Sequence, residues 1–245
     1  MHTSLHTARR ALAPIAIVAG LFALPGIAGA GAVTSATAVA QFELIAADPD
    51  IDVSYEFFTA DTVSGISTTG NSTASVLQTP NTDTIEPLFF VAQDAQSQAE
   101  AYKTRRNDLG AASANLSNEG TIVLDGTNSP GGTVTLGWEY FLTAAQNVTG
   151  INGFASAFAF AQVIIFDDFF GLDLEQSVQA LYDGAESETA DDFGEVTLTV
   201  PAGDYNYVTV QLITEADAQF VPLPATAGLL ALGLLGLRSI RRRAV

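Results

Sequence analysis

Grouped carboxylates are the side chains of this chain with the clearest capacity for chemistry. The first group, a weak candidate for a calcium site, is Asp167, Asp168, Asp173 and Glu175. A second group lies a little further along the chain and comprises Glu186, Glu188, Asp191, Asp192 and Glu195. Carboxylate oxygens are the ligands that Ca²⁺ prefers, but several must converge on one point, and solvated acidic loops are the competing interpretation. We expect no cofactor, and the binding of calcium remains an open alternative.

Histidine and cysteine are missing from residues 31–224. Both histidines, His2 and His6, lie near the N-terminus, and the chain has no cysteine. Their absence excludes Ser-His-Asp and Cys-His catalysis, imidazole acid/base chemistry and Cys/His zinc sites in this region. Glycoside hydrolysis needs only two carboxylates, so a carbohydrate-active enzyme with a carboxylate pair is an alternative function. The preferred prediction is that the protein is not an enzyme.

The same region is strongly acidic. All 27 Asp and Glu residues lie in residues 31–224, but only three of the nine basic residues do, which leaves a formal charge of −24. Such a surface repels phosphate backbones, so we exclude nucleic acid as a partner. The three basic residues, Lys103, Arg105 and Arg106, could contact an anionic exopolysaccharide, although neutralising neighbouring acids is the simpler role.

Aromatic residues offer another way to bind a glycan. Trp138 and Tyr140 share one face of a predicted strand, and so do Tyr205 and Tyr207. If these rings were exposed they could form a platform for sugars, but packing in the core or across strands is the preferred interpretation. A calcium-dependent glycan-binding module is therefore a further alternative function.

The elements that must position these residues have the patterns of β-strands. Apolar and polar residues alternate in residues 51–57 and 134–142, as in half-buried strands. Residues 154–161 alternate phenylalanine with alanine or serine, which indicates a small-residue face that packs closely against another sheet. Further strands are predicted at residues 39–45, 96–103, 120–124 and 172–182.

The segments between these strands complete the predicted fold. Residues 195–200 and 205–214 flank a Pro-Ala-Gly-Asp turn and predict a hairpin. Residues 59–84 predict a long loop or irregular edge, and residues 186–195 an acidic loop. Residues 31–220, hereafter the body, are thus predicted to be one all-β domain, an antiparallel β-sandwich of about eight or nine strands.

Residues 1–30 have the three parts of a signal peptide. Arg9 and Arg10 precede the apolar residues 11–24, and Ala28 and Ala30 provide a small-x-small cleavage pattern. A second possible cut, after Ala40, would leave an unusually long spacer. We expect export across the inner membrane by the general secretory machinery, with cleavage after Ala30.

Residues 221–245 contain a proline motif, an apolar segment and a basic cluster, in that order. The motif is Val221, Pro222, Leu223, Pro224 and Ala225, and the cluster is Arg238, Arg241, Arg242 and Arg243. The apolar segment between them, taken as a helix from Ala225 to about residue 240, would span roughly 24 Å, slightly less than the ~30 Å hydrocarbon core of a membrane. The arginines favour a cytoplasmic C-terminus, with the body on the outer side.

This tail resembles the PEP-CTERM family of bacterial sorting signals in its VPLPA-CTERM variant. The resemblance implies recognition and processing at the short motif by an exosortase-like membrane protease. It also implies that the C-terminal transmembrane helix anchors the protein transiently, before the protein reaches the cell surface or the extracellular space. Together with the exported acidic body, it predicts a non-catalytic cell-surface or extracellular-matrix protein.

Overall fold

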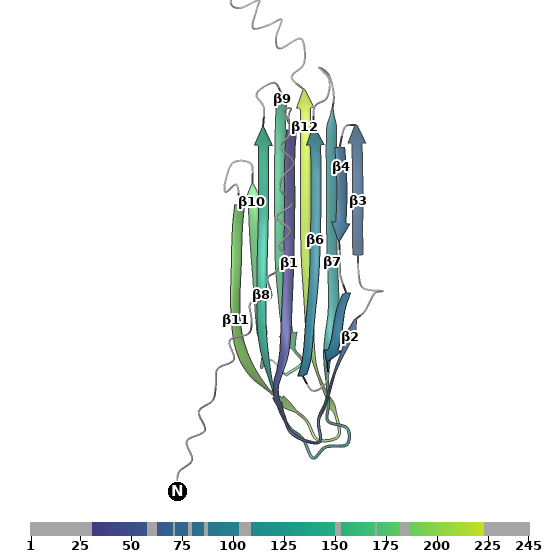
Figure 1. The fold of residues 1–245 in the computed structure, drawn as a ribbon, viewed down its shortest axis with the longest axis vertical. Helices are drawn as coiled ribbons and strands as arrows, with labels where there is room; N and C mark the ends of the chain where they lie inside the picture. The colour runs from purple at the N-terminus through teal and green to yellow at the C-terminus, as the bar shows by residue number, and fades with distance from the viewer. Residues whose placement is uncertain are drawn as a thin grey trace, which may run out of the picture.

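Two antiparallel sheets packed face to face make up the part of the chain that the computed structural model describes. The described residues are 31–57, 63–70, 72–77, 80–85, 88–102, 109–149, 153–169, 171–181 and 187–222. They form an all-β structure with two six-stranded sheets (Figure 1). The predicted signal peptide, the basic cluster at residues 103–106 and residues 223–245 lie outside the described residues.

The first strand and the last strand each lie in the middle of a sheet. Sheet A has the order β11-β8-β1-β6-β4, with β5 also paired to β6. Its strands are β1 (Gly31–Ala47), β4 (Ser72–Leu77), β5 (Pro80–Ile85), β6 (Leu88–Tyr102), β8 (Gly132–Thr149) and β11 (Ser187–Val200). Sheet B has the order β10-β9-β12-β7-β2, with β3 also paired to β7. Its strands are β2 (Asp52–Phe57), β3 (Val63–Gly70), β7 (Gly110–Asp125), β9 (Gly153–Asp167), β10 (Asp173–Leu181) and β12 (Tyr205–Pro222).

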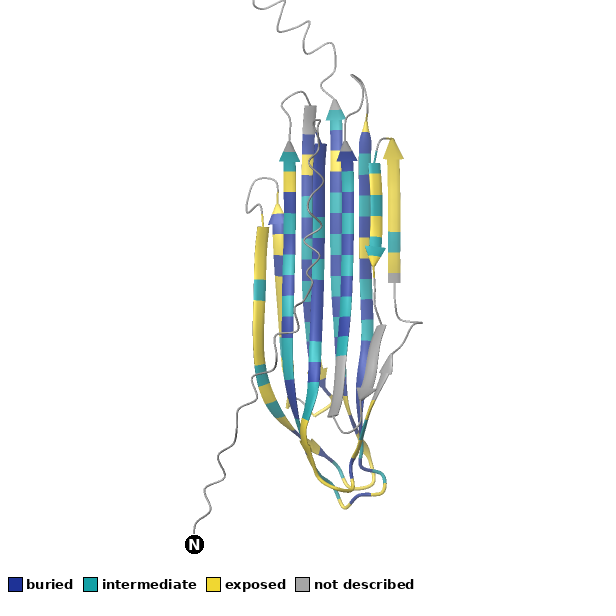
Figure 2. Cartoon of the chain, in the orientation of Figure 1, coloured by how far each residue is buried: buried dark blue, intermediate teal, exposed yellow. Residues whose placement is uncertain are grey.

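Large aliphatic and aromatic side chains fill most of the space between the sheets. The largest of those that are fully buried include Phe42, Leu116, Leu136, Ile165 and Leu212. Buried and less buried residues alternate along the long strands, as Figure 2 shows, because successive side chains point to opposite faces of a sheet. This burial of apolar surface is the main stabilising contribution to the fold.

A second core region, near one end of the sheets, consists mainly of alanine. Its buried members are Ala32, Ala99, Ala101, Ala112, Ala155, Ala157, Ala216, Ala218 and Phe220. The alanines of β9 point inward, which confirms the predicted small-residue face. Buried hydroxyl groups within the sandwich are also paired: the Ser97 and Thr214 oxygens lie 2.7 Å apart, and Thr34 donates to the carbonyl of Ala99.

The predicted hairpin between residues 195–200 and 205–214 is wrong. The turn forms as expected, and Gly203 has a φ of 72°, a conformation that favours glycine. However, β11 pairs with β8 in sheet A, whereas β12 pairs with β7 and β9 in sheet B. The turn therefore crosses from one sheet to the other. Two strands that follow each other in the sequence can bury their apolar faces equally well when they lie in the two facing sheets.

The strand count of eight or nine is too low, since twelve strands occur among the described residues. The segment predicted as a loop at residues 59–84 contains β3, β4 and most of β5, and the predicted acidic loop lies largely within β11. These strands are rich in Ser, Thr and acidic residues and lie at or near sheet edges. Edge strands have fewer apolar neighbours, so their sequences carry a weak hydrophobic pattern.

Both ends of the described body lie at the same end of the sandwich, which we call the proximal pole. Gly31 of β1 is paired with Thr149 of β8, and Pro222 of β12 is paired with Gly153 of β9, only four residues further along the chain than Thr149. The proximal pole is at the top of Figure 1. The opposite end, the distal pole, carries the turns at residues 48–51, 126–131, 168–172 and 201–204. A strand of 17 residues is about 55 Å long, so the two poles are far apart.

Replacing Ala159 by leucine should destabilise the sandwich. Ala159 is fully buried on the inner face of β9, where added methylene groups cost about 1–3 kcal/mol. For a domain of this size we expect a melting temperature about 2–10 °C lower, measured by thermal unfolding of the full chain followed by circular dichroism. Ser156→Leu, at an exposed position of the same strand, is the matched control and should have little effect. Equal losses in the two variants would contradict close packing of this face.

Candidate functional site

The first group of calcium candidates does not converge. Asp167 is buried at the end of β9, where its Oδ1 accepts a hydrogen bond from the Leu172 N–H at 2.6 Å. Its Oδ2 accepts from the Phe169 N–H at 3.1 Å and from the Asn206 amide at 3.3 Å. Both oxygens thus brace the turn between β9 and β10. Asp168, Asp173 and Glu175 are exposed, and Glu175 accepts a hydrogen bond from Gln162.

The second carboxylate group lies along the edge of sheet A. Glu188, Asp191, Asp192 and Glu195 are exposed on β11, while Glu186 lies outside the described residues. The described residues contain no group of three or more Asp or Glu side chains arranged to hold a metal ion. Charged side chains on an edge strand discourage pairing with another chain, so these acids protect the sheet edge.

The turns of the distal pole are also held by their own polar groups. Asp48 accepts a hydrogen bond from the Thr133 N–H at 2.8 Å, and the Gly203 N–H donates to the carbonyl of Gly126 at 3.0 Å. Asp125 accepts from the hydroxyl and the N–H of Thr127. These two hydrogen bonds lower the pKa of Asp125, the hydroxyl contributing more. Asp48 and Asp125 therefore stabilise turns at this pole.

The aromatic candidates divide between the two faces of the sheets. Trp138 and Tyr140 pack against the main core, and the Trp138 ring lies so close to Gly194 that a Cβ there would meet it at 2.7 Å. Burial raises the pKa of the Tyr140 hydroxyl, and the charges of Asp192 and Asp191 raise it further. This confirms packing as the role of the pair. Tyr205 and Tyr207, in contrast, are each more than one third exposed at the start of β12, with ring centroids 5.8 Å apart.

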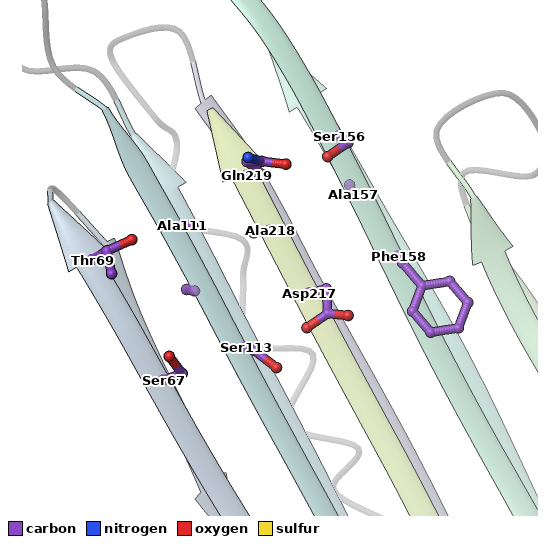
Figure 3. Close-up of a pocket in the computed structure, with 11 residues that line it drawn as sticks. Ser67, Thr69, Ala111, Ser113, Ser156, Ala157, Phe158, Asp217, Ala218 and Gln219 are labelled. Carbon is purple, nitrogen blue, oxygen red and sulfur yellow. The ribbon is translucent and has the colours of Figure 1, made fainter. Parts of the chain in front are cut away.

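A groove on the outer face of sheet B was not predicted. It has a volume of about 460 Å³ and crosses β3, β7, β12 and β9 near the proximal pole (Figure 3). The residues that line it are Ser67, Thr69, Ala111, Ala112, Ser113, Ser156, Ala157, Phe158, Asp217, Ala218 and Gln219. Small side chains on β7 and β9 leave a depression beside larger side chains such as Phe158. The alternation in residues 154–161 indicated one part of this groove. Where the alanines of a strand point inward, the phenylalanines between them point outward.

Two carboxyl groups lie together at this groove. Asp217 lines it, and Glu215 is the preceding residue on the same face of β12. Burial raises the pKa of Glu215, and the charge of Asp217 and a hydrogen bond between the two groups raise it further. A hydrogen-bonded pair is too close for glycoside hydrolysis, in which the carboxyl groups stand about 5 Å or more apart across the scissile bond. The pair therefore does not have the spacing of a glycosidase carboxyl pair.

The first two residues of the predicted sorting motif belong to the folded body. Val221 and Pro222 end β12 and pair with Phe154 and Gly153 of β9. The folded strand thus extends two residues beyond the predicted boundary at residue 220. The other predicted signal residues, namely Ala28, Ala30, Leu223, Pro224, Ala225 and the four arginines, lie outside the described residues. Among the described residues we find no helix with the length and apolar character needed to cross a membrane.

Asp167→Ala should destabilise the protein whether or not calcium is present. The substitution leaves the Leu172 and Phe169 N–H groups and the Asn206 amide without their acceptor, which we expect to cost about 2–4 kcal/mol. Asp168→Ala, at the adjacent exposed position, should cost far less. Thermal unfolding of both variants, with calcium and with a chelator, measures the difference. A loss that occurs only with calcium would instead identify Asp167 as a metal ligand.

Glu215→Gln should stabilise the protein near neutral pH. Because the folded state raises the pKa of Glu215, the stability that its proton provides is complete below the ordinary glutamate pKa and is lost as the pH rises through the raised value. The neighbouring strands place Phe160 and Asn115 beside Glu215, so Asp217 is the ionisable group that faces it. We expect a melting temperature about 1–3 °C higher at about pH 7, and no gain at about pH 3.5.

The control for this variant is Glu195→Gln on the exposed edge strand β11. It removes the same charge from the same acidic protein, so it measures the effect of net charge alone. The difference between the two variants across the pH range isolates the contribution of the Glu215–Asp217 pair. A gain for Glu215→Gln that equals the control at every pH would contradict the coupling.

Comparisons with known proteins add no functional assignment. The chain matches no protein-family model, no curated protein and no solved structure. Function depends on sites rather than on the fold that carries them. The features of this protein that bear on its function are therefore the two poles of the sandwich and the groove of sheet B.

Proposed function

We propose that this protein is an exported, non-catalytic component of the cell surface or extracellular matrix, sorted and processed through its C-terminal signal. One observation carries the proposal: the first strand of the body begins at the proximal pole, and the last strand ends there. The predicted export signal precedes Gly31, and the predicted sorting tail continues from Pro222. The folded body is thus connected at one pole to both segments that handle its transport.

The position of β1 supports cleavage after Ala30 rather than after Ala40. β1 begins at Gly31 and lies between β6 and β8 in the middle of sheet A. A cut after Ala40 would remove the first ten residues of this strand, including the fully buried Val33 and Ala38. Losing that much buried surface and backbone pairing would be strongly destabilising. The expected mature chain therefore starts at Gly31.

The position of β12 supports processing beyond Pro222. β12 lies in the middle of sheet B, and its pairing with β7 ends at Phe220, whereas its pairing with β9 continues to Pro222. Proline has no N–H group and ends a strand most easily where one neighbour is missing. A protease that acts on the following residues, 223–225, would leave every described strand intact.

The shape and charge of the body fit a role outside the membrane. An anchor at the proximal pole would leave the distal pole about 55 Å away from the membrane surface. The strong negative charge keeps such a body soluble and discourages association between copies. The close contact between Glu215 and Asp217 argues against the alternative of a glycosidase, and the groove beside them supports the alternative of a glycan-binding module.

Replacing both Pro222 and Pro224 by alanine should block processing but not membrane insertion. The apolar segment and the arginines remain, so uncleaved precursor should accumulate in the membrane of a host that contains exosortase. Mass spectrometry of the full-length protein and of its exported form measures this. For the unmodified protein we expect a mature form that starts at Gly31 and ends beyond Pro222.

Pro130→Ala, in an exposed turn of the distal pole, is the matched control and should be processed normally. It separates the loss of the motif from a general effect of removing proline. An exported mature form that still ended at Val245 would overturn the processing proposal. In that case the tail would be a permanent anchor.

A further inference from the structure

The outer face of β9 carries a pair of phenylalanine rings beside the groove. Phe158 and Phe160 point outward because the alternating alanines of the same strand fill the core. Their ring planes lie within 8° of each other, with centroids 6.5 Å apart. Figure 3 shows the Phe158 ring broadside, over the broad face of the sheet. The two rings therefore provide a flat apolar surface that is partly exposed.

Polar groups lie in the groove along one side of this surface. The groove presents the carboxylate of Asp217, the amide of Gln219 and the hydroxyls of Ser67, Thr69, Ser113 and Ser156. Within the part of the chain that the structure describes, the amide of Gln219 and the hydroxyl of Ser156 make no hydrogen bond to protein. They are available to a ligand. A flat apolar surface bordered by hydrogen-bonding groups matches a sugar ring, which has an apolar C–H face and a rim of hydroxyls.

The negative charge at the groove determines which class of glycan it can bind. Among the described residues, Asp217 is the only ionisable side chain that lines the groove, and Glu215 lies next to it. The region around the groove belongs to a body with a formal charge of −24, which repels uronates, sulfates and phosphates. We propose that the outer face of sheet B, at Phe158, Phe160 and the adjoining groove, binds a neutral polysaccharide.

The form of the groove indicates a polymer as the ligand. It crosses four neighbouring strands on the surface of the sheet, so a chain can continue beyond both ends. Sugar rings stack on Phe158 and Phe160, and their hydroxyls donate to Asp217 and exchange hydrogen bonds with Gln219. This inference deepens the proposed function and rests on it for its biological meaning, because it names the class of matrix polymer that the exported body binds.

The test uses the full chain, purified in a mild detergent. Affinity electrophoresis through gels that contain dextran, laminarin, galactomannan or hydroxyethyl cellulose measures binding to neutral polymers, with alginate as the anionic comparison. We expect retardation by at least one neutral polymer and none by alginate. Phe158→Ala should raise the dissociation constant for that polymer at least tenfold, and Asp217→Ala should weaken binding while thermal unfolding shows that the protein remains folded.

Phe166→Ala is the matched control, because Phe166 lies on the same outer face of β9, is 41% exposed and is remote from the groove. It should bind as the unmodified protein does. If Phe158→Ala does not fold, Ser156→Phe fills the groove from an exposed position and should abolish binding. Binding to none of the neutral polymers, equal binding to alginate, or equal losses in Phe158→Ala and Phe166→Ala would each overturn the proposal.

The outcome of the binding experiment does not depend on the outcome of the processing experiment. Binding by the purified chain does not depend on where the chain is cleaved, and cleavage does not depend on the outer face of sheet B. A protein that is processed but binds no neutral polymer would retain the proposed function and lose this ligand. A protein that binds but is not processed would retain the site and lose the sorting proposal.

Discussion

The packing of β1 against β12 across the core is the interaction on which the rest of the structure depends. Each strand lies in the middle of its sheet, and side chains of both, such as Phe42 and Leu212, belong to the main core. The chain has no cysteine, so no disulfide shares in this stabilisation. Because one strand is the first in the body and the other is the last, the fold is complete only when the whole body is present. Trimming either end would remove a central strand, not a peripheral one.

This arrangement also determines the polarity of the molecule. Strands of 15–18 residues give the sheets their length, and their antiparallel order brings the start of β1 and the end of β12 to the same pole. The distal pole is then made of turns, in which Asp48 and Asp167 accept hydrogen bonds from backbone N–H groups. Asp167, which the sequence presents as a possible calcium ligand, is here used to close a turn. The acids that remain exposed lie on faces and edges, where they keep the protein soluble.

The choice of side chains for the core has a consequence for the opposite face of the sheet. Close packing near the proximal pole uses alanine on the inner face of β9, and the bulky residues of that strand are left outside. Phe158 and Phe160 thus lie together on the outer face, where both remain partly exposed. The same alternation thus produces the close contact between the sheets and the aromatic surface beside the groove.

The sequence alone determined much of the local structure. Period-two alternation predicted the all-β class and the inner face of alanines, and the Pro-Ala-Gly-Asp residues predicted the turn around Gly203, because each depends on neighbours along the chain. It could also have placed Glu215, Asp217 and Gln219 on one face. It did not determine that β11 pairs with β8, that β3, β4 and β5 form at the sheet edges, or that Ser67 and Ser156 lie along one groove. Backbone hydrogen bonds are alike for every pair of strands, so the partners are decided by how all the apolar faces pack together, and only the tertiary structure shows that outcome.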